Sequence, residues 1–381
     1  MDFGLSPLQQ SIIDSARKFS SEKIAPHYQA REGDRAIDRT LMAQMGQMGF
    51  IAPEVPETLG GSGLDFVTSA LITEAIAEGD LNVAYCQIMS SLVADCIVQF
   101  AQPEAQEEFV PAMCAGQMLG SLGLTEPRGG SDAANLVVKA VKEGDHYVLN
   151  GEKTSISLAD QADFSLLFAR TGTPEQKAHG VTAFLVDLRA EGLTRTRFED
   201  VGEKVVGRGS LFLDNVRVHE KYRVGDEGKG FIQVMHGFDF SRALIGLQCL
   251  ALARKCLDET WVYVTERKAF GKPLAANQGV TFPLAELETF WEGARLVCLK
   301  AIWLKANKQP HTKEAAMAKW WAPKLAFDIA HQCLLLHGHG GYSNELPFEQ
   351  RLRDVLGLQI GDGTAQIMKM IIGRHYVGKF D

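Results

Sequence analysis

The hydrophobic pattern changes twice along this chain of 381 residues. The first region follows helical spacing, as in SPLQQSIIDSARKFSSEKIAP, where a Ser-Pro start precedes apolar residues three or four positions apart. The next region has strand-like stretches, and helical spacing then returns in long segments. The sequence therefore predicts an α+β multidomain protein with an N-terminal helical domain (residues 1–118), a middle β domain (119–230) and a C-terminal helical domain (231–381).

Within these regions the pattern predicts individual elements. DFSLLFAR, VTAFLVDL and SLFLDNVRV are typical of strands, and Asn150-Gly151 in HYVLNGEKTSIS predicts a hairpin turn. PEVPETLGGSGLDF, residues 53 to 66, is predicted as a loop because it is rich in Pro and Gly. The glycine clusters GEKVVGRG and GHGGYS do not join a strand to a helix, which argues against a dinucleotide-binding Rossmann unit.

Charge and cysteine usage restrict the partners and the compartment. The net charge is -8 and Lys and Arg are not clustered, so nucleic acid is not the expected partner. Seven scattered cysteines without a CxxC pair indicate free thiols in a reducing cytoplasm and no metal site of the zinc type. The N-terminus has no basic and apolar leader pattern, and no 18-residue uncharged run occurs, so neither secretion nor a membrane span is expected.

Two short stretches have the residues for chemistry. LTEPRGGSDAANL contains a glycine turn whose amides and hydroxyls can hold phosphate or ring carbonyl oxygens, although a plain surface turn is the simpler interpretation. In LQIGDGTAQIMKM, Asp362 lies between two glycines just before a predicted helix. By itself this pattern favours a carboxylate that caps the helix beginning near Thr364.

Six stretches in order resemble the acyl-CoA dehydrogenase family, and the resemblance covers nearly the whole chain. They are PETLGGSG, TEPRGGSD, EKVVGRGS, FDFSRALIG, ERKAFGKPLAANQ and GDGTAQ. The resemblance implies an N-terminal helical domain, a β-barrel-like middle domain, a C-terminal four-helix bundle and one FAD per subunit. It also implies a homotetramer that oxidises acyl-CoA to enoyl-CoA and passes electrons to an electron-transferring flavoprotein.

The resemblance further implies which residues contact FAD. One group would belong to the same subunit: Leu122, Leu124, Thr125, Gly130, Ser131, Ser155, Ser157, Thr364 and Gln366. A second group would reach the FAD of a neighbouring subunit: Arg267, Phe270, Gln278 and Gly338. The family commonly has Trp at the position of Ser155, so this chain leaves more room there.

Substrate contacts follow in the same way. The resemblance places the CoA near Ser131, Phe238, Asp239 and Arg242, and the acyl group near Tyr85, Met89, Ser90, Gly361 and Gly363. The acyl segment LNVAYCQIMSSLVADC contains no Arg or Lys, which argues against the branch that decarboxylates dicarboxylyl substrates. For its apolar residues, core packing is the simpler interpretation.

Asp362 stands where the family has its catalytic Glu, which makes it the candidate base for the α-proton. Ser241 occupies the alternative base position of some members, and a hydroxyl needs its own activator. Alicyclic members such as cyclohexane-1-carboxyl-CoA dehydrogenase also resemble this chain in carrying Asp, and Gly361 and Ser155 add width for a ring. The alternatives are a short-chain or branched-chain acyl-CoA dehydrogenase, a nitroalkane-oxidase-like flavoenzyme and a non-catalytic flavin-bound partner.

Overall fold

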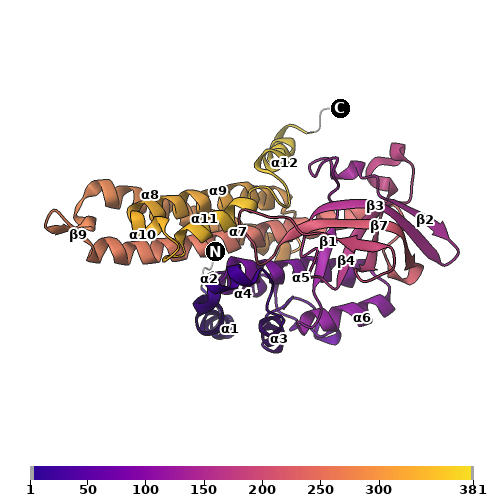
Figure 1. The fold of residues 1–381 in the computed structure, drawn as a ribbon, viewed down its shortest axis with the longest axis horizontal. Coiled ribbons are helices and arrows are strands. Elements are labelled where there is room, and N and C mark those ends of the chain that lie inside the picture. Colours follow the sequence, from indigo (N-terminus) through magenta and orange to yellow (C-terminus); the bar gives the residue numbers. More distant parts are fainter. Residues whose placement is uncertain (1–3, 379–381) are drawn as a thin grey trace.

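The N-terminal region is helical in the computed structural model, which describes residues 4–378 (Figure 1). Polar caps begin several of its helices: Ser6 forms a capping box with Gln9, and Asp65 and Asp80 accept hydrogen bonds from the first turns of the helices that follow them. The helices are α1 (Pro7–Phe19), α2 (Tyr28–Asp34), α3 (Arg39–Gln47), α4 (Phe66–Ala77), α5 (Leu81–Phe100) and α6 (Pro103–Cys114).

The middle region forms one eight-stranded sheet in the order β6-β7-β3-β2-β4-β5-β8, with β1 parallel to β4. The three predicted strands are confirmed as β4, β5 and β7, and every residue of β4 is buried. The strands are β1 (Gly120–Gly123), β2 (Lys139–Glu143), β3 (His146–Ser157), β4 (Phe164–Arg170), β5 (Val181–Asp187), β6 (Leu193–Arg195), β7 (Arg208–His219) and β8 (Arg223–Val224).

The predicted hairpin at Asn150-Gly151 is wrong. Strand β3 continues through this dipeptide and pairs with β7 on both sides of it, with a shift of register between Leu149 and Gly151. Gly151 has a φ of 134°, and the Asn150 side chain bonds to Asn215 on β7. The dipeptide therefore forms an irregularity within a strand, and the turn before β3 lies at Gly144 instead, which has a φ of 64°.

The C-terminal region is a long bundle that projects away from the sheet, and the short strands β9 and β10 lie near its far end (Figure 1). Helix α9 packs against α7, α8, α11 and α12, so it forms the centre of the bundle. The elements are α7 (Gly230–Glu266), β9 (Lys268–Ala269), β10 (Lys272–Pro273), α8 (Gln278–Ala306), α9 (Thr312–Leu336), α10 (His339–Tyr342), α11 (Phe348–Gly357) and α12 (Ala365–Val377).

The predicted order of helical, β and helical regions is confirmed. The boundaries at residues 118 and 230 stay a prediction. By length and composition, one helix in the described part of the chain, α5, is apolar enough to cross a membrane. However, 89% of its most apolar window is buried inside the protein, where α5 packs against α4, α6, α7 and β1. The packing of this core helix accounts for its apolar sequence.

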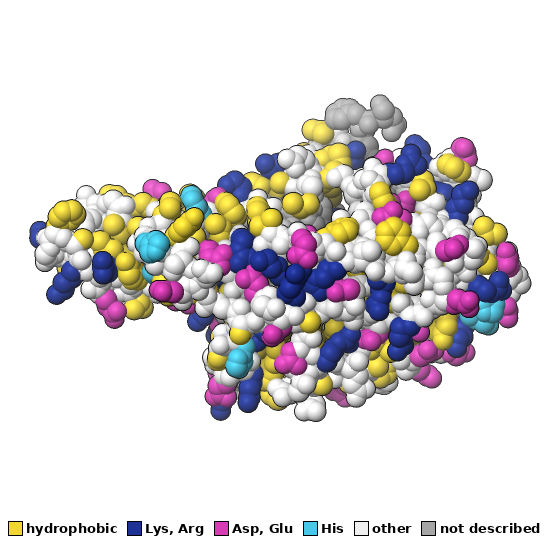
Figure 2. Space-filling model, viewed as in Figure 1, with side chains coloured by type: hydrophobic (Ala, Val, Ile, Leu, Met, Phe, Trp, Pro, Cys, Tyr) yellow, Lys and Arg dark blue, Asp and Glu magenta, His cyan; other side chains and the backbone are white. Residues whose placement is uncertain are grey.

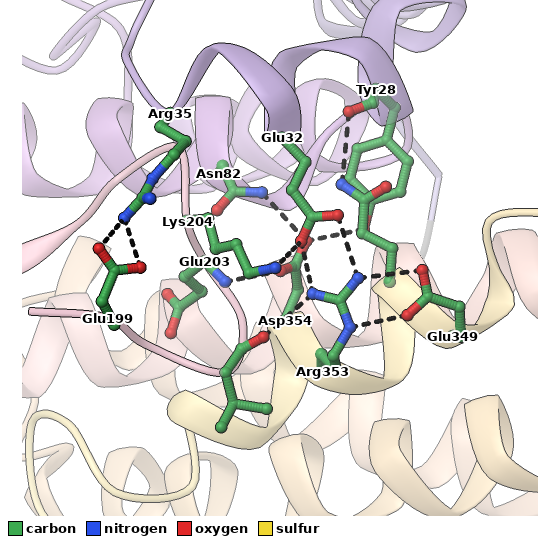
Figure 3. Close-up of polar contacts among 12 residues, drawn as sticks. Tyr28, Glu32, Arg35, Asn82, Glu199, Glu203, Lys204, Glu349, Arg353 and Asp354 are labelled. Atoms are coloured by element: carbon green, nitrogen blue, oxygen red, sulfur yellow. Dashed lines mark hydrogen bonds and ion pairs between the residues drawn. The ribbon is translucent and has the colours of Figure 1, made fainter. Parts of the chain in front are cut away.

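Asp354 on α11 joins the three regions of the chain (Figure 3). One carboxylate oxygen accepts from the amide of Glu203 at 2.6 Å. The other accepts from the hydroxyl of Tyr28 at 2.7 Å and from the amide side chain of Asn82 at 3.0 Å. Because these donors come from the middle and N-terminal regions, a single buried side chain of the bundle bonds to both of them.

The surface around this junction is charged. Figure 2 shows Lys and Arg side chains gathered at the middle of this face, with Asp and Glu side chains among them. The ion pairs at the junction are Arg35 with Glu199, Lys204 with Glu32, and Arg353 with Glu32 and Glu349. These pairs compensate one another's charge, so the basic residues here are structural rather than a docking patch for a polyanion.

Candidate active site

The turn that holds Asp362 lies between α11 and α12, and Asp362 has a left-handed backbone with a φ of 54°. Asp and Asn adopt this conformation at lower cost than most residues other than Gly. The hydroxyl of Thr364, and not the carboxylate of Asp362, caps α12 by accepting from the amide of Ile367 at 3.4 Å. The helix-cap interpretation of Asp362 is therefore wrong, because Thr364 is the N-cap of α12.

The side chain of Asp362 is half-buried, and its carboxylate makes no hydrogen bond or ion pair within residues 4–378. Burial raises its pKa, and the charges of Lys319, Arg242 and Arg208 oppose that rise. The anion is thus supported by cations at a distance while its lone pairs stay free. A general base needs this combination, since an oxygen already bonded to a cation accepts a proton poorly.

Arg242 on α7 lies beside this turn. Its guanidinium donates to the main-chain oxygen of Asp362 at 3.2 Å and to the carboxylate of Asp239 at 3.1 Å. The second oxygen of Asp239 accepts from the hydroxyl of Thr312 at 2.5 Å, and the guanidinium stacks 5.4 Å from the ring of Phe238. Three of the four residues expected at the CoA therefore lie together on α7, and the polar contacts of Asp239 and Arg242 are made with each other, with the base turn and with Thr312.

Tyr85 on α5 connects the expected acyl segment to the sheet. Its hydroxyl lies 3.1 Å from the hydroxyl of Ser157 on β3, and burial together with the charge of Asp362 raises its pKa. Met89 is buried on the same helix, and Ser90 donates to the main-chain oxygen of Cys86 at 3.0 Å. An expected acyl contact, an expected flavin contact and the candidate base thus converge from three regions of the chain.

The glycine turn after β1 is anchored by a buried carboxylate. Glu126 accepts from the amides of Val137 and Val138 at 2.6 and 2.9 Å and from the ammonium of Lys153 at 2.7 Å. Leu124 is buried, while Leu122 and Thr125 are half-buried at the start of the turn. The turn therefore has a fixed base, and only its tip is exposed.

At that tip, Gly130 and Ser131 are exposed. Within residues 4–378 neither their amides nor the Ser131 hydroxyl has a hydrogen-bond partner. Free amides and hydroxyls on an anchored turn are the donors that a pyrophosphate requires, so the residues present fit FAD. Ser155 is exposed with a φ of 55°, Gly361 and Gln366 are exposed, and Gly363 is half-buried.

The second group of expected FAD contacts lies elsewhere. Arg267, Phe270 and Gln278 flank β9 and β10 at the end of the bundle far from the sheet (Figure 1). Phe270 is fully exposed with a φ of 51°, and Gly338 is exposed between α9 and α10. One chain does not bring these residues to the turn at Gly130 and Ser131.

Sequence reasoning missed two of the cations near Asp362, Lys319 and Arg208. Lys319 is buried in α9, and Arg208 on β7 pairs with Glu203, which is itself fully buried. Arg208 also lies 3.4 Å from Asp200, so its charge is already compensated. The available signal was the single Lys inside the apolar run AAMAKWWAP, which a helical pattern does not require. Among the residues that the structure describes, no cluster of His, Cys, Asp or Glu could hold a metal ion.

The helical regions around a sheet, the anchored glycine turn and the free carboxylate define a flavin-dependent oxidoreductase. The chain matches the N-terminal, middle and C-terminal domains of acyl-CoA dehydrogenase at residues 6–117, 121–216 and 228–377. It belongs to the acyl-CoA dehydrogenase family. Members use FAD and act on the CH-CH bond of acyl-CoA thioesters.

Individual relatives agree with this assignment. The chain is 34% identical to a probable acyl-CoA dehydrogenase of Bacillus subtilis, covering 98% of this chain and 99% of the relative. It is 33% identical to benzylmalonyl-CoA dehydrogenase of Aromatoleum aromaticum, with 98% and 99% coverage. The solved structure of butyryl-CoA dehydrogenase from Megasphaera elsdenii matches with a TM-score of 0.95 at 32% identity, covering 99% of this chain and 100% of that one.

Proposed function

We propose that this chain dehydrogenates an alicyclic acyl-CoA of the cyclohexane-1-carboxyl-CoA type, with Asp362 as the base for the α-proton. The observation that carries the proposal is the half-buried carboxylate of Asp362, which is free of hydrogen bonds in the described part of the chain. Its hydrogen-bonding capacity is available to a substrate, whereas the neighbouring buried carboxylate of Asp239 is fully engaged.

In the proposed reaction, Asp362 accepts the proton from the α-carbon as the C–H bond breaks, and the electron pair of that bond forms the α,β double bond. When bound, FAD supplies the acceptor for the hydride that leaves the β-carbon. Burial raises the pKa of Asp362 above that of an ordinary Asp, which makes the carboxylate a stronger base. The charges of Lys319, Arg242 and Arg208 favour its ionised form.

Three features support a wide, branched α-carbon. Asp is one methylene shorter than Glu, so the substrate carbon must come closer to the backbone. A Cβ added to Gly361 would meet only one atom within 4 Å, the main-chain oxygen of Gly357 at 4.0 Å, so the space beside the base is open. Ser155 replaces an indole with a small exposed side chain.

The acyl segment contains no Arg or Lys, which argues against a dicarboxylyl substrate. Arg208 is the cation that the middle region places near Asp362, but Glu203 and Asp200 already compensate its charge. A second carboxylate on the substrate would therefore find no free positive partner in Arg208. A hydrocarbon ring has no such requirement.

We also infer a homotetramer in the cytoplasm that passes electrons to an electron-transferring flavoprotein, as the family resemblance implies. The position of Arg267, Phe270 and Gln278 supports a site completed by another subunit, because they lie at the opposite end of the bundle from the glycine turn. A fully exposed Phe270 is a further argument for burial against a second chain. Sedimentation of the purified protein tests the tetramer.

Anaerobic bleaching of the flavin tests the substrate. The purified holoenzyme is mixed with cyclohexane-1-carboxyl-CoA and, in separate experiments, with butyryl-CoA, isobutyryl-CoA, glutaryl-CoA and nitroethane. We expect fast bleaching by the cyclic thioester and much slower bleaching by the others. Preference for a linear or branched thioester would discard the ring, and bleaching only by nitroethane would discard CoA as well.

A further inference from the structure

We propose that Lys319 is a positioning residue for the base: its buried ammonium holds the turn that carries Asp362 and supplies positive charge without occupying the carboxylate. The inference rests on the proposed role of Asp362 and adds a residue that the family motifs above do not include. It follows from the contacts of one side chain in the centre of the bundle.

Lys319 bridges the two ends of the base turn. Its ammonium donates to the main-chain oxygen of Leu358 at 2.7 Å and to that of Gly363 at 3.2 Å. Leu358 follows α11, and Gly363 directly follows Asp362. Arg242 donates to the main-chain oxygen of Asp362 itself. Two cations from two different helices therefore hold three carbonyls of one short turn, which fixes the backbone that aims the carboxylate.

The charge of Lys319 has no direct carboxylate partner. Within residues 4–378 no carboxylate lies at ion-pair distance from its ammonium, although the side chain is only 1% exposed. The other fully buried lysine, Lys153, bonds directly to Glu126 at 2.7 Å. A buried ammonium bonded only to carbonyls is costly, so a purely structural role would be better filled by an apolar side chain of similar size.

The groups around Lys319 explain what the charge does. Asp362 is the group whose charge most favours the protonated lysine, and Glu203 and the thiol of Cys249 act in the same sense. Arg242 opposes it, and burial lowers the pKa of Lys319 to about 8. Reciprocally, the charge of Lys319 favours the ionised form of Asp362 more strongly than the charge of Arg242 or Arg208 does. The pair is thus coupled through space, and the lone pairs of the carboxylate remain available.

The first test is the pH dependence of flavin reduction in Lys319→Met. Without the ammonium the pKa of Asp362 rises further, so the ascending limb of the reduction rate moves to higher pH. A shift of one pKa unit lowers the rate at a pH below the limb about tenfold. The matched control is Lys324→Met on the same helix, where an exposed lysine pairs with Asp328. In this control we expect the pH dependence of flavin reduction to match that of the wild type. An unmoved limb in Lys319→Met would overturn the proposal.

Lys319→Gln separates hydrogen bonding from charge. Its amide can still donate to a main-chain oxygen of the turn but carries no charge, so we expect the limb to move as in Lys319→Met with a smaller loss of thermal stability. This variant also keeps the test valid if Lys319→Met fails to fold. If Lys319→Gln kept the pH dependence of the wild type, the lysine would act only through its hydrogen bonds. That result would contradict the proposal that its charge acts on Asp362.

A double-mutant cycle on thermal unfolding gives a readout that needs no turnover. We expect Lys319→Met to change the Tm by different amounts in the wild type and in Asp362→Asn, because the second background lacks the charge that Lys319 faces. Equal changes would contradict the coupling. If Asp362→Asn reduced its flavin at the wild-type rate, the proposed function would fail, while the Tm cycle would still report separately whether Lys319 and Asp362 interact.

Discussion

Two carboxylates lie eight positions apart on the C-terminal region, Asp354 buried and Asp362 half-buried, and they are used in opposite ways. Asp354 accepts hydrogen bonds from Glu203, Tyr28 and Asn82, which come from the other two regions (Figure 3). Asp362 accepts none from the residues that the structure describes. Burial raises the pKa of both groups, so a raised pKa alone does not distinguish a structural acid from a reactive one. Free lone pairs do.

The charges around the two groups differ in sign. Asp80 and Glu203 lie near Asp354 and add to the effect of burial, which together raise its pKa to about 7. Asp362 instead faces Lys319, Arg242 and Arg208, which oppose the effect of burial. The negative neighbours of Asp354 favour its protonated form, whereas the hydrogen bonds from Glu203 and Tyr28 favour its anion. The charges around Asp362 favour an anion that is ready to take a proton from a bound substrate.

The largest expected effect comes from Asp362→Asn. The amide cannot accept the α-proton, so flavin reduction by the preferred thioester slows by about 10² to 10⁴-fold, the usual contribution of a general base. Because Thr364 caps α12, the fold and the bound flavin should be unaffected. Stopped-flow absorbance of the anaerobic holoenzyme measures the rate. Reduction at the wild-type rate would remove Asp362 from the mechanism.

Asp354→Asn tests the structural role of the other carboxylate. One of the donors from Glu203, Tyr28 or Asn82 would face an amide that cannot accept, which leaves buried polar groups unpaired. We expect the free energy of unfolding to fall by about 1 to 3 kcal/mol. Denaturant titration followed by flavin fluorescence measures it. A larger effect of this variant on the reduction rate than that of Asp362→Asn would reverse the two roles.

The same aspartate predicts how stability depends on pH. Its folded pKa, about 7, lies above the ordinary value for Asp, so the folded state binds more protons than the unfolded state between those two values. The stability that it contributes is fully present below the ordinary pKa and is lost as the pH rises through 7. Unfolding midpoints across this range should decline in the wild type and decline less in Asp354→Asn. Parallel curves for the two proteins would contradict the assignment.

The smallest expected effect is that of Thr364→Ala. Removing the N-cap of α12 should lower stability by about 1 kcal/mol and leave the pH limb of flavin reduction in place. Thermal unfolding and the reduction rate are measured on the same preparation. A moved limb would mean that the cap also positions the carboxylate two residues before it.

The sequence by itself determined the order of the regions, the strands β4, β5 and β7, and the start of a helix near Thr364. These features follow from hydrophobic period and capping, which act between residues three or four positions apart. The six motifs also determined the family. By contrast, Asn150-Gly151 misled the prediction, because the local preference for a hairpin was overridden by the pairing of β3 with β7 along its whole length.

Tertiary structure alone decided which of the two carboxylates is free. Asp354 lies within α11 and Asp362 in the turn that follows it, and neither stretch of sequence shows that Tyr28, Asn82 and Glu203 arrive from distant parts of the chain to occupy the first of them. The same holds for Lys319, whose contacts lie about forty positions away along the chain. Hydrogen bonds and charges act through space at a few ångströms, so groups remote in sequence determine the environment of a buried carboxylate only once the chain is packed.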